Sequence, residues 1–172
     1  LPSGKSPWRR WCSAALAGHW YQLEWASGSK GSCYLVEDKR RRVCLTLSGG
    51  GSGEGATVAL LRRIARDFLP PRLLELARNH GLKAHGVTIR DQKSRWGSCS
   101  ETGGISLNWR LILLSPTLQD HVLLHEMAHL NHFDHSRAFH AFLESLDPQA
   151  TRNARALQAA SPRIIHLGRT AS

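Results

Sequence analysis

Short alternating runs of apolar and polar residues dominate the first third of this 172-residue chain. Tyr21, Leu23 and Trp25 occur at every second position, and two later apolar runs continue the pattern to residue 47. Period two places alternate side chains on one face of a strand, so the pattern predicts an antiparallel sheet over 19–47. Residues 1–18 are basic and aperiodic, which predicts a loosely attached arm.

Helical spacing replaces this alternation after a glycine-rich connector at 48–55. Leu61 and Ile64 belong to an apolar series with steps of three and four, which predicts a helix. Two consecutive prolines, Pro70 and Pro71, interrupt the series. Each proline removes a backbone donor and clashes with the preceding turn, so we expect a break or kink there.

Two further runs, at 85–90 and 104–108, read as neighbouring strands of a second small sheet. The strand at 104–108 could serve as an edge on which an extended peptide pairs through main-chain hydrogen bonds. Ser115 and Pro116 predict the start of a new helix, because serine caps free amides and proline suits the first helical position.

This last helix carries the sequence His-Glu-x-x-His at 125–129. Residues four apart lie on one helix face, so His125 and His129 can reach a single metal ion, with Glu126 beside it. A third histidine, His135, follows after five intervening residues. Three protein ligands with one position left open are typical of a catalytic zinc site.

The third ligand has competitors in the same segment. His132 could remain on the helix, but it would then lie about 60° short of the ligand face. His140 and Glu144 offer an imidazole and a carboxylate from a following helix. We favour His135, which predicts one zinc ion per chain held by His125, His129 and His135.

Composition adds constraints on partners and location. The formal charge is +10, from 23 Lys and Arg against 13 Asp and Glu, which favours anionic partners such as nucleotides or nucleic acid. Four cysteines without a C-x-x-C pair indicate a reduced, cytoplasmic protein. No apolar run approaches the about 20 residues that span a bilayer, so we expect no membrane partner.

The segment Arg-Trp-Gly-Ser-Cys-Ser at 95–100, the strand at 104–108 and the histidine segment together resemble the YgjP-like metallopeptidase family, a zincin-type group related in outline to SprT-like proteins. The resemblance covers about residues 58 to 157. It implies a zinc cofactor, His125, His129 and His135 as ligands, and Glu126 as the catalytic residue. The chain departs from the family at His140, where a tryptophan is usual.

Within the Arg-Trp-Gly-Ser-Cys segment, Trp96 is expected to pack under the metal helix. Arg95 could bind a substrate carboxylate or phosphate, although a structural salt bridge is an alternative. We also assign Asn108, on the neighbouring strand, to substrate binding. Ser98 and Cys99 are not expected to act as nucleophiles.

The sequence therefore predicts an α+β, zincin-like fold. An N-terminal antiparallel sheet is followed by helices, a second small sheet and the active-site helix, with a hydrolase core over 56–160 and a tail over 161–172. The favoured activity is zinc-dependent hydrolysis of peptides or proteins through an activated water, with Glu126 as general base. The alternatives are a metal-dependent nucleotide phosphohydrolase and a nucleic-acid-associated SprT-like protein.

Overall fold

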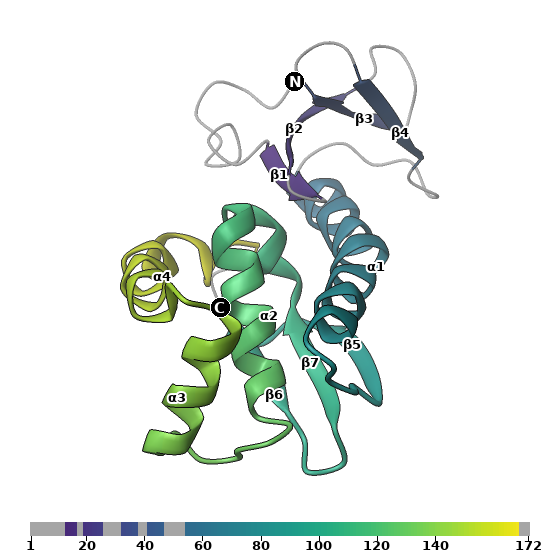
Figure 1. Cartoon of the computed structure of the whole chain (residues 1–172). Helices are drawn as coiled ribbons and strands as arrows, with labels where there is room; N and C mark the ends of the chain where they lie inside the picture. Colours follow the sequence, from purple (N-terminus) through teal and green to yellow (C-terminus); the bar gives the residue numbers. More distant parts are fainter. Residues whose placement is uncertain (1–12, 17–18, 26–31, 38–40, 47–53, 169–172) are drawn as a thin grey trace.

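The computed structural model describes residues 13–16, 19–25, 32–37, 41–46 and 54–168 (Figure 1). Most of the predicted basic arm and glycine-rich connector lies outside these residues. The architecture is α+β, as the sequence predicts, with two sheets and a set of helices that surround the histidine segment.

The N-terminal sheet is antiparallel, in the order β1-β2-β3-β4. Its strands are β1 (Ser13–Leu16), β2 (His19–Trp25), β3 (Ser32–Glu37) and β4 (Arg41–Thr46). The predicted sheet is therefore present, with one strand more than expected. The added strand, β1, falls inside the predicted arm and pairs with β2 from Ser13↔Gln22 to Leu16↔His19.

A long helix, α1 (Glu54–Asn79), follows and runs through Pro70 and Pro71 without ending. The predicted break is therefore wrong, whereas the alternative of a kink stays a prediction. Leu69 and Leu73 are 2% and 0% exposed on either side of the proline pair. Burial of apolar side chains in both halves offsets the lost backbone hydrogen bonds, because helical stability in proteins comes chiefly from tertiary packing.

The second sheet has the order β5-β7-β6, from strands β5 (Gly86–Arg90), β6 (Gly97–Cys99) and β7 (Gly104–Asn108). β7 pairs in parallel with β5 and antiparallel with β6. The sequence predicted β5 and β7 as neighbours but treated β6 as a connection. Because β7 has a partner on both sides, it cannot offer a free edge to a peptide, and that expectation is wrong.

Four more elements complete the chain: the 3-10 helix η2 (Trp109–Leu113), then α2 (Pro116–Ala128), α3 (Arg137–Leu146) and α4 (Ala150–Ile164). α2 packs against α1, α3 and α4, and it lies beside β6 (Figure 1). Ser115 caps α2 by accepting a hydrogen bond from the Leu118 N–H at 3.4 Å, and Pro116 starts the helix, as predicted.

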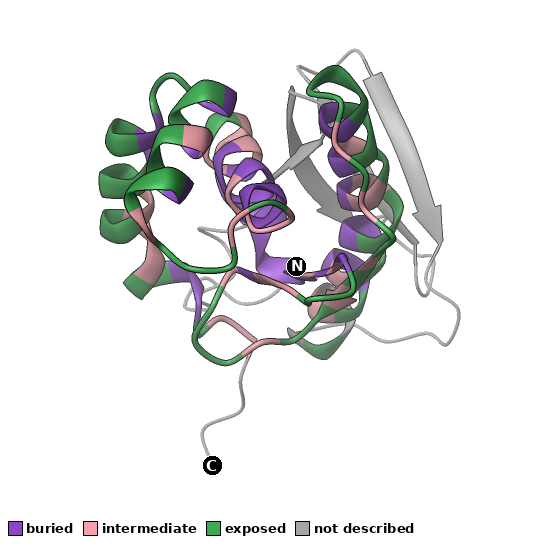
Figure 2. Ribbon diagram, turned by 60° about the horizontal axis from the view of Figure 1, so that its bottom comes forward, coloured by how far each residue is buried: buried purple, intermediate pink, exposed green. Residues whose placement is uncertain are grey.

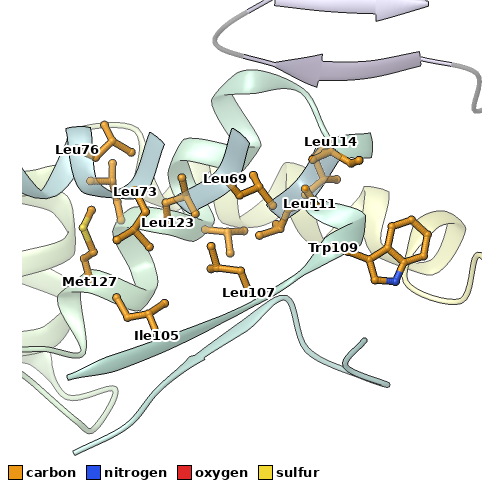
Figure 3. Packing of buried hydrophobic residues seen from close by; sticks show 14 of the residues in the cluster. Leu69, Leu73, Leu76, Ile105, Leu107, Trp109, Leu111, Leu114, Leu123 and Met127 are labelled. Carbon is orange, nitrogen blue, oxygen red and sulfur yellow. The ribbon is translucent and has the colours of Figure 1, made fainter. Parts of the chain in front are cut away.

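The core lies between α1, α2 and β7. Buried positions of the two helices line the space between them (Figure 2). Ile105 and Leu107 alternate with Ser106 along β7 and meet leucines of α1 and the Met127 side chain of α2 (Figure 3). Burial of Met127 and its neighbour Ala128, both 0% exposed, fixes the rotation of α2. The other face of the helix therefore presents its histidines away from the core.

Candidate metal centre

His125 and His129 occupy one face at the end of α2. Their ring centroids are 5.1 Å apart and the ring planes are nearly perpendicular, at 80°. His125 stands in the last turn, and His129 is the C-cap residue, still with helical backbone angles. The four-residue spacing therefore brings the two imidazoles together as the sequence predicts.

His135 reaches these two rings from beyond the helix end. The chain turns after His129, and α3 then begins at its cap residue Ser136, whose Oγ accepts a hydrogen bond from the Phe139 N–H. This turn places Nε2 of His135 3.3 Å from Nε2 of His125. Ligand atoms of His125, His129 and His135 all lie within 4.8 Å of one another.

The competing third ligands have other surroundings. The carbonyl oxygen of His132 accepts a hydrogen bond from Nδ1 of His129 at 2.9 Å, while the His132 ring packs against Phe142. Glu144 lines a separate depression with Arg152. Neither these residues nor His140 joins the three-histidine cluster in the described part of the chain.

The hydrogen bond to His132 also settles the tautomer of His129. A carbonyl oxygen can only accept, so Nδ1 of His129 carries the proton and Nε2 keeps its lone pair. A backbone carbonyl on the outer nitrogen is the usual means of orienting a metal-binding histidine. The role of His132 is thus to direct the His129 ring through its backbone.

Phe139 forms an apolar floor beneath the cluster. It is 0% exposed, and its ring stacks on His129 at a centroid distance of 4.5 Å. The same ring presents its plane at steep angles to His125 and His135, at 5.0 and 4.8 Å. All three imidazoles therefore share one rigid support from α3.

Burial and neighbouring histidines favour the neutral form of His125 and His129. Burial, followed by the neighbouring histidines, lowers the pKa of His125 to about 4. Burial also lowers the pKa of His129. Metal binding requires neutral imidazole. The rings of His125 and His129 can therefore bind a metal near pH 7 without first losing a proton.

Glu126 lies beside the cluster and is tightly enclosed. It is 6% exposed, and burial raises the pKa of its carboxyl group to about 7, against the opposing charge of Arg95. Gly97 on β6 faces it so closely that a β-carbon there would lie 2.7 Å from Oε1 of Glu126. The absence of a side chain at residue 97 is what makes room for the carboxylate.

These groups line one cavity of about 400 Å³, within the range of small-molecule and cofactor sites. β6 and the residues before it form one wall, and α2 forms another, with Phe133 and Leu157 at the sides. Trp96 belongs to the first wall, and its Nε1 donates a hydrogen bond to Oγ of Ser161 in α4. Trp96 thus ties the wall to α4 as well as standing beside the metal helix.

The two predicted substrate-binding residues have different environments. Arg95 is exposed and lines the cavity. Asn108 is 0% exposed, donates to the carbonyl oxygens of Gln92 and Arg95 at 3.0 Å each, and accepts from the Arg110 N–H. Its amide is fully used by the protein, so we assign Asn108 to holding the Arg95 loop in place of substrate binding.

Three features of the site were not predicted from the sequence. These are the strand β6 with Gly97, the aromatic floor at Phe139, and His121, which also lines the cavity. His121 precedes His125 by four residues, so helical spacing alone would have placed it on the ligand face. The close approach of Gly97 to Glu126 has no local sequence signal, because it joins residues distant in the chain.

Comparison with known proteins decides the family. A family model described as "YgjP-like, metallopeptidase domain" matches residues 6–160. The chain belongs to the YgjP-like metallopeptidase family. It is therefore a peptidase-type hydrolase, and the family implies a catalytic metal.

Among solved structures, the chain is similar to the metallopeptidase zymogen of Pyrococcus abyssi abylysin, with 24% identity and a TM-score of 0.47. The match covers 54% of this chain and 94% of the other. A comparison with curated protein sequences found no significant match.

The residues present fit the metal that the YgjP-like family implies. Three imidazole groups converge, and the outer nitrogen of His129 is engaged by a carbonyl so that its inner nitrogen is available. The carboxyl group of Glu126 and the three imidazoles line the same cavity. Within the described residues, no helix has the length and apolar character needed to cross a bilayer.

Proposed function

We propose that this YgjP-like protein is a zinc-dependent peptidase, with one ion held by His125, His129 and His135 and with Glu126 as general base. The observation that carries the proposal is the buried Glu126 carboxyl group beside three converging imidazoles in one cavity. Three neutral nitrogen ligands suit zinc and leave a coordination position open. When bound, zinc polarises the scissile carbonyl and acidifies water.

Glu126 supplies the proton transfers. Its carboxylate accepts a proton from the attacking water as the oxygen bonds to the carbonyl carbon. The same proton then passes to the nitrogen of the leaving amine as the C–N bond breaks. The enclosure by Gly97 restricts Glu126 to one position, which serves both transfers because the attacked carbon and leaving nitrogen are adjacent.

β6 supports binding of an extended peptide. It is the edge strand next to α2, and its residues Gly97, Ser98 and Cys99 all line the cavity. An edge strand presents unpaired backbone groups to which an extended peptide can add as a further strand. We infer that β6, in place of the predicted β7, is the strand along which the substrate lies.

Arg95 remains a proposed substrate contact. Among the described residues that line the cavity it is the one cation other than histidine. It can pair with a carboxylate of an acidic or C-terminal peptide residue. A nucleotide polyphosphate would require several cations around it, so the cavity favours the peptide over the nucleotide alternative.

The test compares wild-type protein with Glu126→Gln, both loaded with zinc, on a pool of internally quenched peptides. We expect wild-type cleavage that chelation abolishes and zinc restores, and loss of turnover by about 100-fold or more in Glu126→Gln at equal zinc content. Phosphate release from nucleotides by wild type, without peptide cleavage, would replace the proposal with the phosphohydrolase alternative.

A further inference from the structure

His121 belongs to the active-site wall, although neither metal binding nor proton transfer by Glu126 uses it. It lies on α2 one turn before His125, with ring centroids 6.4 Å apart. It is 3% exposed and is one of the residues that line the cavity. Buried polar atoms are normally hydrogen-bonded, so each ring nitrogen is expected to bond either to the protein or to a molecule bound in the cavity.

One nitrogen of this ring is held by Asp147. Nδ1 of His121 lies 2.7 Å from Oδ2 of Asp147, which is the C-cap residue of α3. Asn153 donates to both carboxylate oxygens, at 3.2 and 3.0 Å, and the Gln149 N–H donates to Oδ1 at 3.0 Å. The Asp147 carboxylate thus interacts with three residues, His121, Gln149 and Asn153.

These donors keep Asp147 ionised. Burial works against the charge, but the hydrogen bonds from Asn153 and His121 lower the pKa of the carboxyl group below its ordinary value. A carboxylate has no proton to donate, so the hydrogen of the Asp147–His121 bond belongs to Nδ1. In the neutral ring this leaves Nε2 with a lone pair.

Nε2 of His121 is available to a ligand. It makes no hydrogen bond within the described part of the chain. It is also not one of the side-chain atoms there that are both fully buried and without a hydrogen-bond partner. Since the ring lines the cavity, its free nitrogen offers an acceptor to the cavity contents. The anchoring of Nδ1 fixes the direction of this acceptor.

We propose that Nε2 of His121 accepts a hydrogen bond from a main-chain N–H of the bound peptide, and that Asp147 positions the ring and sets its tautomer. The inference rests on the proposed peptidase function. It makes His121 a specificity-determining residue, because an ester or an N-alkylated peptide offers no hydrogen at that position. Peptide N–H groups are donors, which complements an acceptor-only nitrogen.

Equilibrium binding to a zinc-loaded, full-length protein carrying Glu126→Gln tests this without turnover. The probe is the pool member that wild type cleaves best, together with analogues in which each N–H flanking the scissile bond is replaced in turn by an ester oxygen. We expect His121→Leu to weaken binding of the all-amide peptide about 3- to 10-fold, the usual worth of one neutral hydrogen bond.

The decisive result is the coupling between residue and N–H. At one position, ester replacement should weaken binding when His121 is present and change nothing in His121→Leu. His80→Leu, an exposed histidine substitution outside the cavity, should leave all affinities unchanged. The inference is overturned if the effect of every ester replacement is the same with and without His121. That result is expected if the ring donates a hydrogen bond to a substrate oxygen instead.

Asp147→Asn provides a second test that keeps His121 in place. The oxygen of the introduced side-chain amide would remain with the Gln149 N–H, so the amide nitrogen would face Nδ1 of His121 and drive the ring proton to Nε2. Imidazole nitrogen NMR should show that tautomer change, with loss of the preference for the amide peptide. An Nε2-protonated tautomer in the starting protein would contradict the inference.

The outcomes separate this inference from the function on which it rests. Wild-type cleavage of peptides combined with no His121 coupling overturns the inference alone. Absence of any zinc-dependent peptide cleavage removes the proposed function, and the substrate role of His121 with it. Zinc content and thermal unfolding of each variant identify any effect that arises from misfolding.

Discussion

Gly97 and Glu126 approach so closely that a β-carbon on residue 97 would lie 2.6 Å from Cγ of Glu126. Gly97 lies on the edge strand β6, and Glu126 lies on α2. Their contact therefore places the proposed general base directly against the strand proposed to bind the substrate. A side chain at residue 97 would have to displace either β6 or the carboxylate.

Gly97→Ala is therefore expected to reduce kcat by about 100-fold, because displacement of a catalytic group by about 1 Å has an effect of that size. Zinc content should remain unchanged, since the histidines do not depend on residue 97. Gly86→Ala is the matched control: it also lies in the second sheet, and its added β-carbon meets nothing within 4 Å. Equal peptidase kinetics for Gly97→Ala and wild type would contradict the prediction.

Phe139→Ala should destabilise the fold by about 3–5 kcal/mol, because it empties a site that is 0% exposed. It should also weaken zinc binding, since the ring supports all three imidazoles. Urea unfolding and competition with a zinc chelator measure the two effects. Phe133→Ala is the stability control: Phe133 is 56% exposed, so its loss should change stability little, and a similar loss in both variants would refute the account of the floor.

The two histidines that follow the end of the metal helix should behave differently on substitution. His135→Ala should lose zinc, because it removes an imidazole from the cluster. His132→Ala should retain zinc, because only the backbone carbonyl of His132 contacts His129. Metal content after dialysis against a weak chelator distinguishes the variants, and the reverse order would transfer the ligand role to His132.

Acid should remove the stabilisation that Asp147 provides. Hydrogen bonds from Asn153 and His121 outweigh the effect of burial and lower the pKa of Asp147 in the folded state. Such a group stabilises the fold fully above its unfolded pKa of about 3.9 and loses this contribution as pH falls through its lower, folded value. The urea midpoint of wild type should therefore exceed that of Asp147→Asn near neutral pH, and the difference should shrink below about pH 4. A difference independent of pH would show that the carboxylate charge is not involved.

The sequence was most informative where the chemistry is local. The spacing of His125 and His129 follows from helix geometry, and the cap at Ser115 follows from its side chain. Local propensity at the proline pair of α1 favours a break, whereas burial of Leu69 and Leu73 holds the helix together. Tertiary packing of this kind has no signature within a short window.

Pairings between distant segments account for the other differences. β6 is only three residues long, and it is a strand because β7 pairs with it. The buried position of Asn108 beneath the Arg95 loop likewise depends on that fold. His121 had a readable spacing, but its significance depends on Asp147, which lies 26 residues later. The position of His121 on the ligand face can be found from the sequence, whereas its contact with Asp147 cannot.

Anomalous diffraction at the zinc edge from crystals of the full chain tests the central claim most directly. The account predicts one peak per chain, within about 2.0–2.1 Å of nitrogen atoms of His125, His129 and His135. Full zinc occupancy at a site built instead from His132, His140 or Glu144, or no bound metal in protein that cleaves peptides, would contradict it.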